Sequence, residues 1–306
     1  MSKTDGDSPT AVPLLKMITP ELSASKVAGF IGLHKYQSPT ELYYELLLKD
    51  KDARAVVLAL ETATGRRSFT GLLNEVLKEQ PVKDCIYTGI ADANKTENVG
   101  GVLEEVEAQA RVILDLRRDA LPRDVRDKLV AEIRGKISKG RGIQNENAIL
   151  DQYEVARDVK VTERNTKTFR KDYGAFKLVG RTDGYVASEN RIVDSKDRTR
   201  WWPEVPLYDE IQLRVYMEMA GATESELIER FPDGRVRHTK YLNDREKWSS
   251  LQSAIEAGVA KLNALLTDEE ALKRVVFANT VCLEYGGEPD VRRSARLAGT
   301  ATLTGV

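Results

Sequence analysis

The sequence has few of the side chains that bind soft metals. Its 306 residues include two cysteines, Cys85 and Cys282, and two histidines, His34 and His238, with no pair at metal-ligand spacing. A zinc finger, a cysteine-bound iron–sulfur cluster, an HExxH metalloprotease and a disulfide framework are therefore excluded as local motifs. By elimination, the side chains left for catalysis are carboxylates, Lys, Arg and Tyr. Carboxylates are ligands of hard cations such as Mg²⁺ or Mn²⁺.

Long apolar runs and an excess of charge of one sign are also missing. There are 47 Lys and Arg against 48 Asp and Glu, a formal net charge of -1, so any nucleic-acid site must come from local basic clusters. The first residues are polar, and no apolar run approaches ~18 residues. Together with two isolated thiols, this predicts a soluble, intracellular protein that does not associate with membranes.

The order of the patterns predicts an α/β or α+β protein. Flexible termini are expected at residues 1–17 and 286–306, with a single domain at 18–285 between them. Residues 50–138 are mainly helical in pattern and carry no chemical motif, which indicates a helical insertion. The expected later elements are helices at 123–139 and 142–157, strands at 159–163, 176–187 and 191–198, a helix at 207–220, a hairpin turning at 231–234 and a helix at 244–266.

Two of the predicted strands bring carboxylates and an amine together. Asp194 and Lys196 share one face of their strand because alternate side chains point the same way. If the turn before this strand is two residues long (189–190), Asp183 pairs with Lys196. A turn of three residues would instead pair Asp183 with Ser195, on the other face.

A third acid lies on the predicted helix at 142–157. Glu146 falls in a stripe with Ile143, Leu150 and Tyr153 at three-four-three spacing. A carboxylate that faces a core needs a cation or protons. An internal ion pair with Arg or Lys is the alternative interpretation.

One further pair shares a helix face. Gln212 and Tyr216 are four residues apart on the predicted helix at 207–220. Their amide and phenol suit the binding of a phosphate or a nearby carboxylate.

The chain order of these residues resembles a known pattern. A helix Glu, an Asp, an acidic residue two before a Lys, and a QxxxY helix occur in this order in the PD-(D/E)XK nuclease superfamily. The sequence is most similar to its lambda-type exonuclease, or YqaJ-like viral recombinase, family, in the forms found in large DNA viruses. Residues 22–28, 32–39 and 140–146 also carry the resemblance, which covers about 18–48 and 139–265. The sequence departs from the family in having Asp194 where Glu is usual, and in the length of the insertion.

The resemblance implies a fold and a chemistry. The fold would be a restriction-endonuclease-like core, a central mixed β-sheet flanked by helices. Glu146, Asp183, Asp194 and the carbonyl of Ser195 would hold one or two Mg²⁺ ions, with Mn²⁺ as a substitute. Lys196 would position the attacking water and help to deprotonate it. Gln212 and Tyr216 would complete the catalytic set.

The resemblance also implies DNA as the substrate. The enzyme would degrade duplex DNA from an end, 5′ to 3′, in recombination, repair or genome processing. Ser25 matches the family position that binds the terminal 5′-phosphate, although a plain helix cap is an equal alternative. The expected DNA contacts, each with a solvated surface charge as its alternative, are Arg141, Arg181, Arg198 and Arg200. The adjacent Trp201 and Trp202 are expected either to stack on bases or to pack in the core.

Partners and alternatives follow from the same resemblance. A single-strand annealing protein or another recombination protein would be a partner, and a homo-oligomer is allowed. A viral source would place the protein in the nucleus or cytoplasm of the host cell. Two other functions stay open: a single-strand or structure-selective nuclease of the same fold, and a catalytically silent DNA-binding recombination partner.

Overall fold

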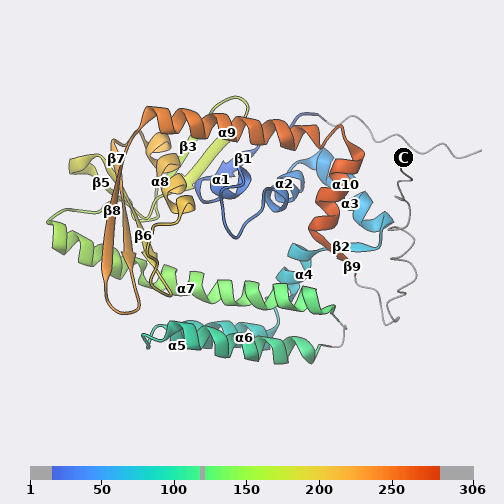
Figure 1. Ribbon diagram of the computed structural model, residues 1–306, viewed down its shortest axis with the longest axis horizontal. Helices are drawn as coiled ribbons and strands as arrows, with labels where there is room; N and C mark the ends of the chain where they lie inside the picture. The colour runs from blue at the N-terminus through green and yellow to red at the C-terminus, as the bar shows by residue number, and fades with distance from the viewer. Residues whose placement is uncertain (1–15, 118–120, 283–306) are drawn as a thin grey trace, which may run out of the picture.

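The computed structural model describes residues 16–117 and 121–282 (Figure 1). The predicted tail at 286–306 and nearly all of the predicted N-terminal segment lie outside the described residues. The helices in the described part are α1 (Ala24–Phe30), α2 (Pro39–Leu47), α3 (Lys51–Ala63), α4 (Phe69–Val76), α5 (Gln80–Ala93), α6 (Val99–Asp115), α7 (Arg123–Arg157), α8 (Leu207–Ala220), α9 (Arg245–Ala264) and α10 (Glu269–Ala278). The strands are β1 (Glu21–Ser23), β2 (Arg66–Ser68), β3 (Thr168–Asp172), β4 (Lys177–Arg181), β5 (Gly184–Val186), β6 (Arg191–Asp197), β7 (Glu224–Arg230), β8 (Val236–Leu242) and β9 (Thr280–Cys282).

The described strands form sheets of four, three and two strands. The four-stranded sheet has the order β5-β6-β7-β8, and its central pair β6 and β7 runs parallel with α8 as the connection. The three-stranded sheet has the order β1-β4-β3, and β2 pairs with β9. The predicted α/β class with mixed sheets flanked by helices is confirmed, although the strands are divided between sheets and do not make one central sheet.

Local sequence signals set several helix ends. Ser38 caps α2, because its hydroxyl accepts a hydrogen bond from the Glu41 N–H at 3.2 Å. Asp244 caps α9 in the same way, with its carboxylate accepting from the next turn. Gly221 ends α8 with a φ of 67°, a backbone conformation that favours glycine. The expected helix at 207–220 is therefore confirmed to the residue.

The longest helix was not expected as one element. α7 has 35 residues and replaces the two helices predicted at 123–139 and 142–157. The predicted break lay between Lys139 and Gly142, around Gly140, a residue with low helix propensity. Close packing explains Gly140, since a Cβ there would lie 2.4 Å from the Ile90 Cδ1 atom on α5. Tertiary contact along the helix thus outweighs the low helix propensity of glycine.

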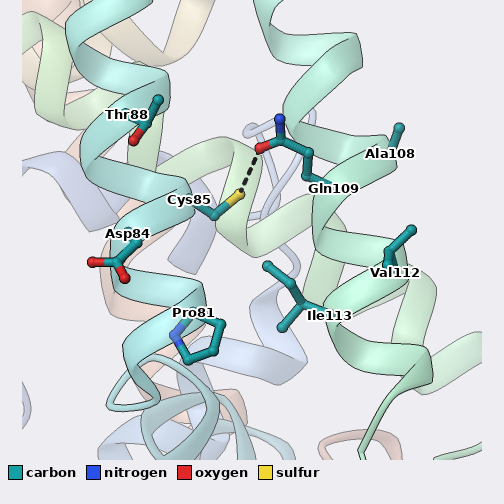
Figure 2. A pocket seen from close by; sticks show the side chains of 8 residues that line it. All are labelled: Pro81, Asp84, Cys85, Thr88, Ala108, Gln109, Val112 and Ile113. Atoms are coloured by element: carbon teal, nitrogen blue, oxygen red, sulfur yellow. Dashed lines mark hydrogen bonds between the residues drawn. The ribbon is translucent and has the colours of Figure 1, made fainter.

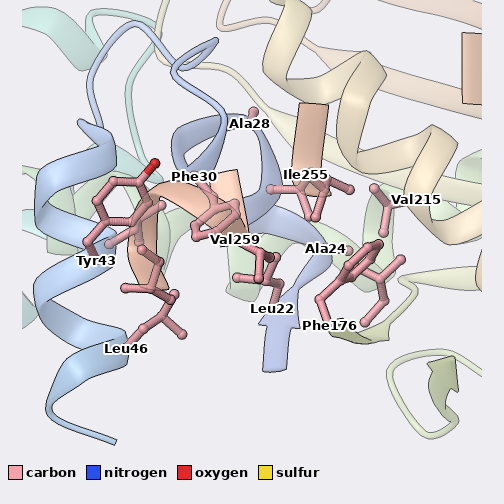
Figure 3. Packing of buried hydrophobic residues seen from close by; sticks show 14 of the residues in the cluster. Leu22, Ala24, Ala28, Phe30, Tyr43, Leu46, Phe176, Val215, Ile255 and Val259 are labelled. Carbon is pink, nitrogen blue, oxygen red and sulfur yellow. The ribbon is translucent and has the colours of Figure 1, made fainter. Parts of the chain in front are cut away.

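The two halves of α7 belong to different hydrophobic cores. The main core lies between the sheets and helices α1, α2, α8, α9 and α10, around buried side chains such as Phe30, Phe176 and Ile255 (Figure 3). A second core joins α4, α5 and α6 to the first half of α7 through residues such as Leu103 and Ile133. In Figure 1, α5 and α6 lie on the side of α7 that faces away from α1 and α2. A small third cluster packs the second half of α7 against the four-stranded sheet.

The first part of the predicted insertion at 50–138 is tied to the rest of the chain by two contacts. Ala53 and Val57 of α3 belong to the main core. β2 pairs with β9, so that Arg66 lies opposite Cys282 near the end of the described chain. None of the described helices has the combination of length and apolar character needed to cross a membrane.

Candidate active site

Asp194 and Lys196 form a close ion pair on β6. The Lys196 Nζ atom lies 2.5 Å from the Asp194 Oδ2 atom, and Asp194 is buried. Both side chains project from the same face of the strand, as the two-residue period of a strand requires. The structure therefore brings Asp194 and Lys196 together as the sequence predicted.

The predicted register of the β5–β6 hairpin is wrong by two residues. Gly184 pairs with Val193 and Val186 with Arg191, so the turn spans 187–190 and includes a short 3-10 helix. The predicted pairing of Asp183 with Lys196 is therefore absent. A slip of two residues keeps every side chain on its predicted face, whereas a slip of one would have reversed it.

Asp183 lies at a break between two strands. β4 ends at Arg181 and β5 begins at Gly184, although one strand was predicted over 176–187. Outside the ladder, the Asp183 carboxylate turns to β6, where its Oδ2 accepts hydrogen bonds from the Ser195 N–H at 2.8 Å and the Ser195 hydroxyl at 3.2 Å. The break thus lets Asp183 reach the strand that carries Asp194.

Glu146 approaches the site from α7, but not through an apolar stripe. Leu150 and Tyr153 are buried as predicted, whereas Ile143 is 72% exposed. Glu146 itself is half-buried, and its carboxylate accepts a hydrogen bond from the Asn165 amide. α7 packs on β6, and the charges of Asp194 and Lys196 act on the pKa of Glu146, although its carboxylate is bound to Asn165.

Gln212 and Tyr216 of α8 lie beside the Asp194 carboxylate, and Gln212 contacts it. The Gln212 amide donates to the Asp194 Oδ1 atom at 3.4 Å and to the Tyr216 hydroxyl at 3.0 Å. Tyr216 is buried, and burial raises the pKa of its hydroxyl, followed by the charge of Asp194. The predicted i and i+4 pair therefore holds one of the strand carboxylates.

Burial is the main cause of the raised pKa values of the three carboxylates. Burial, followed by the charge of Asp183, raises the pKa of Asp194 to about 7. Burial also raises the pKa of Asp183 and of Glu146. Burial alone would lower the pKa of Lys196, but Asp194 and the other nearby carboxylates raise it, so Lys196 stays protonated at neutral pH.

The donor set suits a hard divalent cation, but the side chains do not surround one point. Carboxylate oxygens are preferred ligands of Mg²⁺, and a cation would offset the burial and the smaller charge repulsion that raise these pKa values. Within residues 16–117 and 121–282, no three His, Cys, Asp or Glu side chains are grouped to hold a metal ion. The Glu146 carboxylate turns to Asn165, and that of Asp183 to Ser195.

Two of the arginines predicted to contact DNA are instead internal. Arg141 is only 6% exposed; its NH1 lies 2.9 Å from the Asp197 Oδ2 atom, and its Nε donates to the carbonyl of Ala93. Arg198 lies between two buried carboxylates, Asp209 and Glu229. Both predictions are corrected, because these guanidinium groups are used within the fold and do not face solvent.

The other predicted DNA contacts are at the surface. Arg181 is exposed, and its charge lowers the pKa of Glu146 against the larger effect of burial, which places it beside the site. Arg200 is exposed and lies over the Trp202 ring at 4.9 Å. Ser25 is exposed as the second residue of α1, whose N-cap is Ser23. Ser25 is therefore not the helix cap.

Trp201, which follows β6 in the chain, has its ring packed against two other side chains. The Arg235 guanidinium lies 3.9 Å from the Trp201 ring centroid, and the Phe231 ring lies at 4.5 Å. Trp201 therefore packs against the β7–β8 hairpin, but it is 44% exposed and does not belong to the core.

Sequence patterns missed two contributors to the site. Asn165, which binds Glu146, follows α7 in an irregular loop and belongs to no motif. Asp209, whose charge acts on Asp194 and Lys196, stands three residues before Gln212 on α8. Its place one turn from Gln212 on the same helix was a signal that could have found it.

An open groove elsewhere in the structure has a different character. About 550 Å³ in volume, it lies between α5 and α6 (Figure 2) and is lined by Pro81, Asp84, Cys85, Thr88, Ala108, Gln109, Val112 and Ile113. Burial raises the pKa of the Cys85 thiol, which disfavours the reactive thiolate. Asp84 is the one charged residue among the described residues that line the groove, so the groove lacks the paired charges of the site on β6.

Comparisons with known proteins give structural matches only. No protein-family model matches the sequence. No curated protein sequence matches it either. The fold matches solved structures of exonucleases. An alkaline exonuclease from Laribacter hongkongensis matches with a TM-score of 0.37 and 17% identity, over 55% of this chain and 92% of that one.

Two further matches are of the same kind. The same Laribacter enzyme, solved in complex with dAMP, matches with a TM-score of 0.35 and 15% identity, over 59% of this chain and 86% of that one. A phage-related exonuclease from Haemophilus somnus matches with a TM-score of 0.40 and 12% identity, over 83% of this chain and 97% of that one. At these similarities no residue's role is taken from the matched proteins.

Proposed function

We propose that this protein is a metal-dependent deoxyribonuclease that hydrolyses phosphodiester bonds from DNA ends. The observation that supports the proposal is the contact of Asp194 with both Lys196 and Gln212, which come from β6 and α8. Asp183 binds the neighbouring Ser195, and the pKa of Glu146 responds to the charges of Asp194 and Lys196. Buried carboxylates with raised pKa values, paired with a lysine, are costly to maintain and typical of a functional site. The resemblance of the sequence to lambda-type exonucleases favours duplex DNA and the 5′ to 3′ direction.

Glu146, Asp183 and Asp194 would hold Mg²⁺ or Mn²⁺, which when bound acts as a Lewis acid and lowers the pKa of water. The Lys196 ammonium pairs with Asp194 and keeps its protons, so it would orient water and offset negative charge on the phosphate. Gln212 fixes the orientation of the Asp194 carboxylate from α8.

The proposed activity is tested with end-labelled duplex DNA and Mg²⁺. Lys196→Ala should lower the cleavage rate by roughly 10²-fold or more, because a positioned charge at the reacting group is lost. Lys128→Ala, an exposed lysine on α7, is the matched control and should cleave as the wild type does. Wild-type protein that leaves every labelled DNA intact would favour the silent DNA-binding alternative.

The form of the DNA substrate tests whether degradation begins at an end and whether a 5′-phosphate favours it. Closed circular duplex should resist the enzyme, because degradation is proposed to begin at an end. A 5′-phosphorylated linear duplex should be degraded faster than its 5′-hydroxyl counterpart if Ser25 binds the terminal phosphate. Cleavage of circles at the same rate as linear DNA would instead indicate an endonuclease.

Metal affinity should rise with pH up to about 7. Asp194 is protonated below its pKa of about 7 and then offers no charge to a cation. Isothermal titration with Mn²⁺ should show affinity rising by up to about tenfold per pH unit below that value. A flat profile over that range would contradict the assignment of Asp194 as a ligand.

In the metal-free protein, the raised pKa of Asp194 makes folding stability fall as the pH rises. The folded-state pKa of Asp194 lies above the ordinary 3.8, so the folded state keeps this proton to higher pH than the unfolded state does. The contribution of Asp194 to stability therefore falls as pH rises from about 4 to about 7. Added Mn²⁺ should restore stability most strongly above that range.

A further inference from the structure

The loop between α1 and α2, residues 31–38, carries an exposed ring toward the candidate active site. Tyr36 is 60% exposed. In Figure 1 the loop extends from α1 toward α7. His34 stacks on Tyr208 of α8, with ring centroids 4.3 Å apart and an interplanar angle of 28°, and meets Tyr36 edge-on at 6.3 Å. Three rings thus run from solvent to the first turn of α8.

The inner end of this row of rings lies beside the catalytic lysine. Tyr208 precedes Asp209 on α8, and the charges of Asp209 and Lys196 both act on the Tyr208 hydroxyl. Burial lowers the pKa of His34, and the charges of Asp209 and of Lys139 on α7 act on it with opposite signs. The loop, α7 and α8 therefore meet next to β6.

The loop is held in a fixed shape. The Tyr36 N–H donates to the His34 Nδ1 atom at 3.1 Å, which sets the orientation of the imidazole. At the base of the loop, the Gln37 side chain packs so closely on Gly29 that a Cβ there would lie 2.5 Å from the Gln37 Oε1 atom. A ring held in advance can stack on a ligand without an ordering cost.

Tyr36 differs from the other exposed aromatic groups near the site. Trp201 already has Arg235 and Phe231 against its ring. Among the described residues, the ring of Tyr36 meets only the edge of His34 and the Lys35 ammonium, which lies 5.5 Å from the ring centroid. Lys35 and Lys139 form no ion pair with any residue in 16–117 or 121–282, so both cations are available to phosphates.

We propose that Tyr36 stacks on a nucleobase of the DNA strand whose phosphate lies at Asp194 and Lys196, with Lys35 and Lys139 facing the flanking phosphates. This inference rests on the nuclease function proposed above and specifies its substrate. Stacking on a side chain requires a free base face, so the base beside the cleavage point is terminal or unpaired. His34 acts as a positioning residue that holds the loop on Tyr208.

A fluorescent base tests the contact directly. An oligonucleotide with 2-aminopurine at its terminal nucleotide is titrated with full-length protein, with Ca²⁺ in place of Mg²⁺. Wild type and Tyr36→Phe should quench the fluorescence, and Tyr36→Ala should not. Tyr36→Ala should also bind about tenfold more weakly, the effect of one lost base–aromatic stack. Because Tyr36 is mainly exposed, its variants should melt at the wild-type temperature.

An abasic terminus provides the control for a general loss of binding. Wild type and Tyr36→Ala should bind a strand that lacks the terminal base equally well. Quenching by Tyr36→Ala as strong as that by the wild type, or an equal loss of affinity for the abasic strand, overturns the stacking site. Wild-type protein that quenches the probe but cleaves no DNA with Mg²⁺ refutes the nuclease function and leaves the stacking site in place.

Discussion

Replacing Asp194 with Asn should reduce DNA cleavage by roughly 10³-fold. The change keeps the volume of the side chain and an oxygen for the Gln212 amide, but it removes the buried charge that a divalent cation would meet. Loss of a cation that stabilises charge in the transition state costs several kcal/mol, which corresponds to this factor. The rate is measured with end-labelled duplex at saturating Mg²⁺.

The control for Asp194→Asn is Asp92→Asn, an exposed carboxylate on α5 whose nearest cation is Lys95 at 3.6 Å. Asp92→Asn should cleave at the wild-type rate. Asp194→Asn should also lose the increase in melting temperature that Mn²⁺ gives the wild type, a result that does not depend on activity. Cleavage by Asp194→Asn within tenfold of the wild type would place the catalytic site elsewhere.

Replacing Arg141 with Met should lower the free energy of unfolding by about 3 kcal/mol. Arg141 and Arg230 both pair with Asp197, whose side chain is fully buried. Removal of one partner from a buried ion pair leaves a charge that is poorly compensated, at a cost of about 3–5 kcal/mol. Arg230 remains, so the lower end of this range is expected. Unfolding in urea measures the change.

DNA binding separates this structural role from the role that the sequence predicted for Arg141. An arginine that contacts a phosphate contributes a slope of about -0.9 to the dependence of log affinity on log salt. Arg181→Ala should therefore reduce the slope by about this amount, since Arg181 is exposed beside Glu146. Arg141→Met, assayed where it is folded, should leave the slope unchanged. A reduced slope for Arg141→Met would restore it as a DNA contact.

The sequence was most informative where local signals agreed with the packing. The predicted bounds of the helix at 207–220 are those of α8, which Pro206 precedes and Gly221 ends. The turn at 231–234 was predicted from Pro and Gly between two strand patterns, and β7 and β8 do pair across it. Asp194 and Lys196 were placed on one face by the period of a strand alone.

Features that depend on distant contacts could not be predicted in this way. The β5–β6 register depended on the number of turn residues, and a short 3-10 helix lengthened the turn beyond what the sequence indicated. The strand at 159–163 was predicted from its apolar pattern, but only Thr162 makes a β-bridge, with Tyr185. Arg141 belongs to a basic run, and only the fold reveals the buried Asp197 that it meets.

The continuity of α7 determines what can be removed from this chain. Its first half forms one wall of the core that α4, α5 and α6 complete, and its second half carries Glu146. A shortened protein that lacked α4 to α6 would leave Leu129, Ile133 and Ile137 facing water on a helix that must still hold Glu146 in place. Removal of α4 to α6 as a unit would therefore also require a polar replacement for the apolar face of α7, the helix that carries Glu146.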